Sequence, residues 1–206
     1  MNRKSYSKRP HGDVFSLDVF HPKTGPKDEY TRKNFIVSDT DADDLDIVGH
    51  PVMVNSVIVA LCVKGEALVR LNFENYRLTK GSCVVLATGS MFLCEEGNYS
   101  DDFLADYISF SLNYTKELDL RSFLYDIKHN PHIRLKDSEY ERIYAIYQTL
   151  KNRYEDNGHT YQKEVIQYSL MTAICDFSDI YDKYLTDPKE PEENPYVKKF
   201  FDLLYQ

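Results

Sequence analysis

Several signals typical of membrane and secreted proteins are missing from this chain. It contains no apolar run of about 18 residues, the minimum for a membrane-spanning helix, so no contact with a membrane is expected. No apolar segment follows the basic N-terminus, which argues against a secretory signal peptide. The four cysteines, Cys62, Cys83, Cys94 and Cys175, have no C-x-x-C spacing and lie among apolar residues. They are therefore expected to be buried free thiols in the reducing cytoplasm.

Positive charge is scarce outside the first 33 residues. The chain holds 25 Lys and Arg against 33 Asp and Glu, a formal net charge of -8 at pH 7. The segment 1–33 carries eight of the basic residues and four of the acidic ones, so the rest of the chain is strongly acidic. An acidic body repels the phosphates of nucleic acids. We therefore expect this chain alone to bind DNA poorly.

The signatures of common enzyme sites are also missing. There is no G-x-S-x-G, phosphate-loop or dinucleotide-binding motif. Residues 39–46 hold a D-x-D-x-D string like that of a calcium loop, but Asp44 occupies the glycine position and His50 that of the bidentate glutamate, which favours a solvated loop. His50, Cys83 and Cys94 lack the spacing of a transition-metal site. No metal, cofactor or catalytic residue is predicted, and the chain is not expected to be an enzyme.

The middle of the chain has the pattern of a β-protein. Short β-branched or alternating runs are separated by glycine turns, which is typical of a barrel or a sandwich. The turns are marked by Gly65, Gly81 and Gly89. The expected strands cover residues 54–63, 66–73, 76–78, 82–86, 91–95 and 103–112.

After residue 137 the apolar residues recur every three to four positions, which indicates helices. One helix is expected to end at 157–158, and a second to run over 161–185, about 36 Å at the usual rise. The second helix has a main apolar stripe and a further one. The main stripe is Ile166, Leu170, Ala173, Phe177, Ile180, Tyr181 and Tyr184, and the second stripe is Tyr161, Val165, Tyr168, Thr172 and Cys175.

Two stripes indicate a helix that is covered from two sides. A partner subunit is the simplest cover, and the alternative is a helix wedged inside one subunit. We therefore predict a homodimer whose interface is formed by Val165, Tyr168, Leu170, Thr172, Phe177 and Tyr181.

The last residues have the pattern of a linker followed by the beginning of a further helix. Residues 186–194 form a polar linker with two prolines, and an amphipathic helix is expected over 195–206, with Asn194 as its N-cap. A short helix is marginal alone. We therefore expect a further domain to have followed Gln206.

The most specific pattern is the spacing from Gly81 to Glu96. It resembles the second cupin motif, G-x5-P-x-G-x2-H-x3-N, with Gly81 and Gly89 in the glycine positions. Ala87 stands in the proline position, Phe92 in that of the metal-binding histidine and Glu96 in that of the asparagine. The resemblance therefore implies a cupin-like barrel without its metal, which is more typical of a sensor or binding module than of an enzyme.

Five stretches together resemble the N-terminal half of an AraC-type transcriptional regulator. They are CVKGEALVRLN at 62–72, YRLTKG at 76–81, YISFS at 107–111, YQKEVI at 161–166 and NPYVKKFFDLL at 194–204. The resemblance implies an α+β fold, in which a cupin-like antiparallel β-barrel of the jelly-roll type is followed by a helical dimerisation hairpin. DNA contact would come from a C-terminal helix-turn-helix domain. The implied parts are an arm (1–33), a sensor barrel (34–115), a dimerisation segment (116–185), a linker (186–194) and the first helix of the DNA-binding domain (195–206).

Five residues are candidates for a ligand pocket in the barrel: Arg70, Tyr76, Phe92, Cys94 and Tyr107. Arg70 would bind a carboxylate if it stood at the barrel mouth, but strand alternation favours the outer face. The other four are aromatic or soft groups, for which core packing is the alternative. The leading hypothesis is a ligand-sensing and dimerising part of a cytoplasmic regulator, with an unknown small-molecule effector. The alternative is a metal-free cupin-like protein that binds a small molecule or a partner and has no role on DNA.

Overall fold

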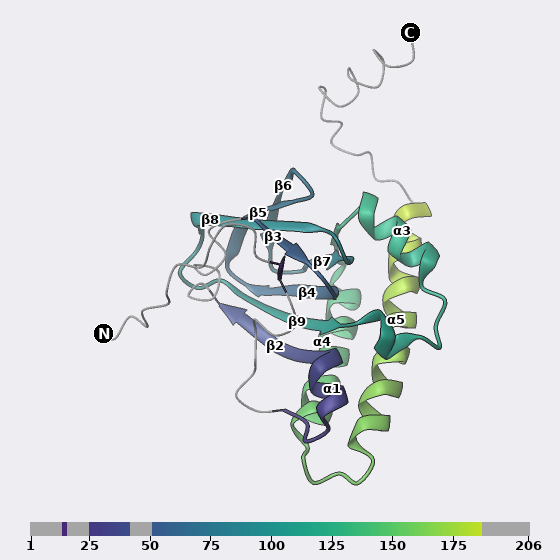
Figure 1. The fold of residues 1–206 in the computed structure, drawn as a ribbon. Helices are drawn as coiled ribbons and strands as arrows, with labels where there is room; N and C mark the ends of the chain where they lie inside the picture. The colour runs from purple at the N-terminus through teal and green to yellow at the C-terminus, as the bar shows by residue number, and fades with distance from the viewer. Residues whose placement is uncertain (1–13, 16–24, 42–50, 187–206) are drawn as a thin grey trace, which may run out of the picture.

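The structure, a computed structural model, describes residues 14–15, 25–41 and 51–186. Two β-sheets lie face to face, and helices cover the outer side of one of them (Figure 1). The expected linker at 186–194 and helix at 195–206 lie outside the described residues, apart from the end of the last helix at Thr186. Within the described residues, none of the helices combines the length and apolar character needed to cross a bilayer.

Sheet A is the layer farther from the helices. Its strands lie in the order β1-β3-β8-β5-β6, with β1 parallel to β3 and the other neighbours antiparallel. The strand bounds are β1 (Val14–Phe15), β3 (Val52–Val54), β5 (Glu66–Leu71), β6 (Glu74–Thr79) and β8 (Met91–Tyr99). Val14 and Phe15 of the N-terminal arm therefore form an edge strand of this sheet.

Sheet B is the middle layer. Its strands are all antiparallel and lie in the order β10-β7-β4-β9-β2. They are β2 (Phe35–Asp41), β4 (Val57–Lys64), β7 (Ser82–Leu86), β9 (Leu104–Phe110) and β10 (His132–Arg134). The acidic string expected to be a solvated loop begins inside β2, since Asp39 and Asp41 belong to this strand.

The expectation of a barrel is wrong for the described strands. Their hydrogen-bonded ladders form two separate five-stranded sheets, so the arrangement is an open cupin-like sandwich. The chain passes from sheet B to sheet A at Gly65 and returns at Gly81. Both glycines have positive φ, at 67° and 89°. These turns bring the sheets together without extending a ladder from one sheet to the other.

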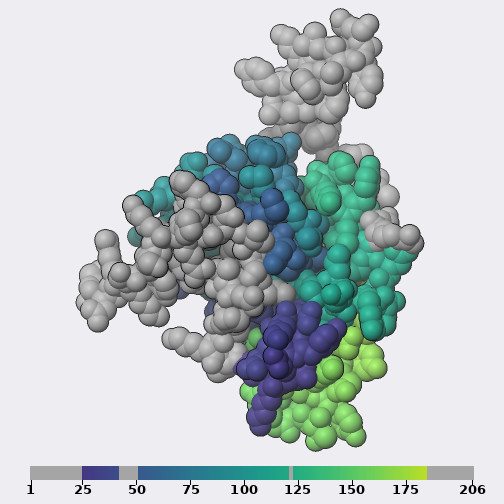
Figure 2. Space-filling view, viewed as in Figure 1, coloured from purple at the N-terminus to yellow at the C-terminus, as the bar shows by residue number. Residues whose placement is uncertain are grey.

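Helices form the third layer, against sheet B. α4 (Asp137–Glu155) and α5 (Gln162–Thr186) pack on each other, and α4 contacts β2 and β9. The bounds of α5 agree with the helix expected at 161–185. The other helical elements are α1 (Glu29–Asn34), η2 (Leu112–Thr115) and α3 (Arg121–His129). In Figure 2 the purple surface of the segment that contains α1 adjoins the green helical layer.

Strand β4 of sheet B has apolar side chains on both of its faces, which explains its unbroken run of apolar residues. On β4, Val57, Val59 and Leu61 belong to the core shared with the helices, while Ile58 and Cys62 pack in the core between the sheets. A strand covered on both sides loses the apolar–polar alternation of a half-exposed strand. The two cores of the protein therefore share this sheet as their wall.

Candidate functional site

A cavity lies between the two sheets. Its free volume is about 100 Å³, several times the ~10–15 Å³ that one water molecule requires. Among the described residues, none of the side chains that line it is charged. The wall is formed by Thr40, Val52, Val54, Ile58, Ala60, Val69, Leu78, Val84, Leu86, Phe92, Phe103, Ala105 and Tyr107.

The alternation of the strands places these side chains. On β9, Ala105 and Tyr107 point into the cavity, while Ile108 belongs to the core on the helical side. On β4, Ile58 and Ala60 face the cavity. Small residues on two neighbouring strands leave the space that larger ones would fill. The cavity therefore results from alanines at inward-facing positions of sheet B.

Two of the sequence-predicted pocket residues lie on the cavity wall, namely Phe92 on β8 and Tyr107 on β9. Phe92 is the residue in the position of the cupin metal ligand, and here its ring is part of an apolar surface. Cys94 is fully buried in the core between the sheets but does not line the cavity. Whether any of them binds a ligand stays a prediction.

Tyr76 lies at the edge of the sandwich, beside the cavity rather than on its wall. Its ring lies 5.6 Å from that of His132, centroid to centroid, so the edge strands β6 and β10 meet there. The Tyr76 hydroxyl donates to Glu74 at 2.8 Å, and burial raises the pKa of Tyr76. Burial also lowers the pKa of His132, with Arg134 adding to the effect. The contact between the Tyr76 ring and the neutral His132 imidazole thus joins the two sheets at this edge.

Arg70 does not line the cavity. It is exposed on β5 between the buried residues Val69 and Leu71, and its Nε donates to Asn75 at 3.1 Å. Alternation turns it to the outer face of sheet A, which is the face that the sequence favoured. A ligand carboxylate in the cavity would therefore not meet this guanidinium.

Most of the cavity wall was missed by sequence reasoning. Residues such as Val52, Leu86 and Phe103 have no feature that separates them from ordinary core residues. The available signal was the period of two in β4 and β9, which groups Ile58 with Ala60 and Ala105 with Tyr107 on one face.

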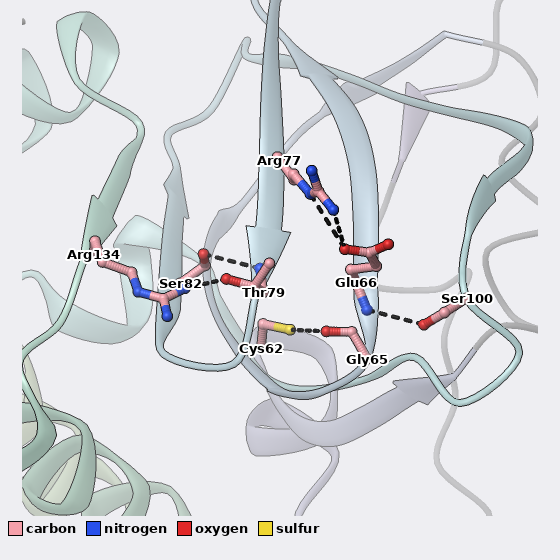
Figure 3. A network of polar contacts seen from close by, with 8 residues as sticks. All are labelled: Cys62, Gly65, Glu66, Arg77, Thr79, Ser82, Ser100 and Arg134. Atoms are coloured by element: carbon pink, nitrogen blue, oxygen red, sulfur yellow. Dashed lines mark hydrogen bonds and ion pairs between the residues drawn. The ribbon is translucent and has the colours of Figure 1, made fainter. Parts of the chain in front are cut away.

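The polar contacts in Figure 3 hold the turns that join the two sheets. Arg77 donates to Glu66 at 2.6 Å, and the Glu66 amide donates to Ser100 at 2.9 Å. A Cβ at Gly65 would lie 2.5 Å from the Ser100 hydroxyl oxygen, so only glycine fits this turn. Burial raises the pKa of the Cys62 thiol to about 11, which leaves it unreactive at neutral pH. The network has the features of structural support.

Two of the cysteines that could have contributed to a metal site lie in different cores. Cys83 lies in the core on the helical side, and Cys94 lies in the core between the sheets. Among the described residues no three His, Cys, Asp or Glu side chains come together in a way that would hold a metal, and His50 lies outside those residues. Cys62, Cys83 and Cys94 are buried as expected, whereas Cys175 is exposed on α5, contrary to the expectation.

The two stripes of α5 have different environments. Leu170, Phe177 and Tyr181 are at most 4% exposed because they pack against the protein's own core. Their assignment to a subunit interface is therefore wrong. The second stripe stays open: Tyr168 is 64% exposed and Thr172 is also exposed. Val165 is partly exposed beside them.

Comparisons with known proteins give distant structural similarities. No protein-family model matches the chain, and no curated protein matches it. Apo ToxT from Vibrio cholerae strain SCE256 is 15% identical over 73% of this chain and 57% of its own, with a TM-score of 0.46. The AraC-like transcriptional activator CuxR is 7% identical over 69% of this chain and 49% of its own, with a TM-score of 0.38. KdgF from Halomonas sp. is 21% identical over 37% of this chain and 68% of its own, with a TM-score of 0.28.

The chain thus spans a little more than half of the length of ToxT and about half that of CuxR. The type of regulator that the sequence resembles is represented among these structures by CuxR. At such low identities and TM-scores the similarities identify no ligand and no site.

Proposed function

We propose that this chain is the ligand-sensing portion of a cytoplasmic transcriptional regulator of the AraC type, and that it binds a small uncharged molecule between its two sheets. The cavity is the observation that carries the proposal, because its back wall is the sheet on which the helices pack. A ligand there contacts Ala105 and Tyr107, whose neighbours on β9 face the helical layer. Binding is thereby positioned to alter that layer.

The chemistry of the wall limits the class of ligand. Among the described lining residues, Thr40 and Tyr107 supply the only hydroxyl groups, and the other side chains are hydrocarbon or aromatic. A charged ligand would lose its hydration without gaining a counter-ion from the wall, which costs several kcal/mol. We therefore assign the cavity to a neutral, mainly apolar molecule that carries at most one or two polar groups.

The proposed regulator pairs with a second copy through the exposed stripe of α5. The stripe comprises Val165, Tyr168, Thr172 and Cys175 of α5, with Tyr161 just before the helix. Exposed tyrosines are suited to such a contact, because the ring is buried against the partner while the hydroxyl stays in water. Arg142 of α4 pairs with Asp176 and Asp179 beside the stripe, which ties α5 to its own subunit.

DNA contact in this proposal belongs to a further domain. The acidic body of this chain does not favour binding to a polyanion. The alternative is a cupin-like binding module that uses the same cavity without a role on DNA. Reading the gene beyond codon 206 separates the two, since about 100 further residues with two helix-turn-helix patterns are expected only for the regulator.

The cavity is tested with N-phenyl-1-naphthylamine, a neutral apolar dye that fluoresces in apolar surroundings. We expect the chain to bind this dye, and Ala60→Leu to weaken binding by about tenfold or more, which corresponds to about 1.4 kcal/mol. Ala145→Leu is the matched control because Ala145 is exposed on α4. Ala105→Val tests the same space with a smaller change. Equal binding by the wild type and both cavity variants would contradict the proposal.

A further inference from the structure

Two carboxylates stand directly behind the cavity, on the opposite face of sheet B. Asp106 lies between Ala105 and Tyr107 on β9, and since both of these line the cavity, the Asp106 side chain points toward α4. On β2, Thr40 lines the cavity, so the side chain of its neighbour Asp39 also lies on the opposite face of the sheet. In the ladder between these strands Asp39 and Asp106 are direct partners. Two like charges thus face each other behind the wall of the site.

Helix α4 supplies the groups that meet these carboxylates. Lys151 Nζ lies 4.0 Å from Asp39 Oδ2 and 5.9 Å from the centre of the Tyr147 ring. Tyr147 is 3% exposed, and Asp106 is 7% exposed. We call Asp39, Asp106, Tyr147 and Lys151 the β9–α4 cluster. It joins the strands of the cavity wall to the helix that supports α5.

The charges in this cluster do not balance. Among the described residues, two carboxylates share one ammonium group. The titratable groups of α4 near Asp106, besides Lys151, are the tyrosines Tyr147 and Tyr140, which are neutral at physiological pH. On β4 the ladder partner of Asp106 is Leu61, which cannot ionise. Burial, the dominant cause, raises the pKa of Asp106 to about 6; Lys151 and Tyr147 lower it, and Asp39 raises it. One carboxylate therefore stays excess and costly while both are ionised.

We propose that the β9–α4 cluster couples occupancy of the cavity to the packing of α4, with Asp106 taking up a proton from solvent when an apolar ligand binds. This inference rests on the proposed function. A ligand replaces water with hydrocarbon next to Ala105 and Tyr107, one residue away from Asp106, and a drier surrounding penalises the charged carboxylate. The proton neutralises Asp106. The repulsion from Asp39 is then removed, and Lys151 is left to pair with Asp39 alone.

Proton uptake and ligand binding must favour each other reciprocally. The protein is expected to bind an apolar ligand more tightly below about pH 6, where Asp106 is already protonated. The packing of α4 on sheet B should respond to the ligand at neutral pH, because there the ligand changes the charge of the cluster. The same change reaches α5, which packs on α4.

The experiment titrates the full chain with N-phenyl-1-naphthylamine from pH 5 to pH 8. For the wild type we expect the dissociation constant to rise by about threefold or more over this range, whereas for Asp106→Asn it should stay constant, because asparagine imitates the protonated group. Asp101→Asn is the control, since Asp101 is an exposed carboxylate, and it should follow the wild type. A pH-independent affinity of the wild type, or an unchanged pH dependence in Asp106→Asn, would overturn the proposal.

Hydrogen–deuterium exchange of residues 137–155 gives a second readout. The dye should slow exchange of α4 in the wild type at pH 7.5, and the slowing should be smaller in Asp106→Asn, whose cluster is already relaxed. No effect of the dye on α4 exchange would also overturn the coupling. The two proposals fail differently. If Ala60→Leu weakens dye binding but the pH dependence or the exchange effect is missing, only the coupling is refuted. If the wild type does not bind the dye, both proposals are refuted.

Discussion

Replacing Asp106 with asparagine is expected to stabilise the folded protein at neutral pH and to leave it almost unchanged at pH 4. In the unfolded chain this carboxyl ionises near its ordinary pKa of 3.8, whereas burial raises the pKa to about 6 in the folded protein. Between these two values the folded state binds more protons than the unfolded state. Stability therefore falls as the pH rises from about 4 to 6, and the loss persists above pH 6.

The size of this effect follows from the shift. Raising the pKa from 3.8 to about 6 corresponds to an upper limit of about 3 kcal/mol at 1.36 kcal/mol per unit. The side chains of Lys151 and Asp39 are 30% and 54% exposed, so water screens part of the interaction. We therefore expect Asp106→Asn to raise the free energy of unfolding by about 1–2 kcal/mol at pH 7.5.

The measurement is urea denaturation followed by far-ultraviolet circular dichroism at pH 4 and pH 7.5. Comparing variant and wild type at each pH cancels the titration of all other groups, and Asp101→Asn shows the effect of removing an exposed carboxylate. A gain of equal size at both pH values, or a loss at pH 7.5, would refute the reasoning, because either result means that ionisation of Asp106 does not oppose folding.

Two further predictions concern α5 and the turns between the sheets. Tyr168→Glu should halve the mass in sedimentation, because it places a charge in the proposed dimer interface, and the chain should stay folded because Tyr168 is exposed on α5. Phe177→Glu should unfold the chain, because Phe177 is buried in the subunit's own core. An unchanged mass for folded Tyr168→Glu would exclude this stripe as the interface. Gly65→Ala should destabilise the protein by about 1–2 kcal/mol more than Gly89→Ala. Both glycines have positive φ, but a Cβ at Gly65 meets Ser100 and Phe103 whereas one at Gly89 meets nothing within 4 Å; equal losses in thermal or urea unfolding would contradict this difference.

The elements of this fold were largely predictable because they depend on local pattern. The period of the apolar residues identified α5 to within a residue at each end, and the glycines at 65 and 81 identified the turns. The prediction of a barrel was wrong for the described strands, because closure of a barrel depends on which edge strands pair with each other. The strand patterns resemble those of a sandwich just as well, since both arrangements bury alternate residues.

The candidate site was predictable only in part. The cupin spacing identified Phe92, and Tyr107 was a candidate as an aromatic group on an expected strand, but no pattern distinguished Val52 or Leu86 from other core residues. The β9–α4 cluster could not be predicted from the sequence, because it depends on the register that sets Asp39 opposite Asp106 and on where α4 packs. Such contacts join residues far apart in the chain, and single-sequence patterns carry no information on them.

Sheet B, which is covered on both faces, has a consequence for how such a protein diversifies. Successive residues of β4, β7 and β9 serve different tasks, since one faces the cavity and the next supports the helices. Substitutions at Ala60, Val84 or Ala105 reshape the pocket while their chain neighbours keep the helical contacts intact. Under the proposed ligand-sensing function, a lineage of such proteins can therefore exchange one recognised compound for another by changing every second residue. Comparison of natural relatives should reveal this as positions of fast and slow change that alternate along the three strands.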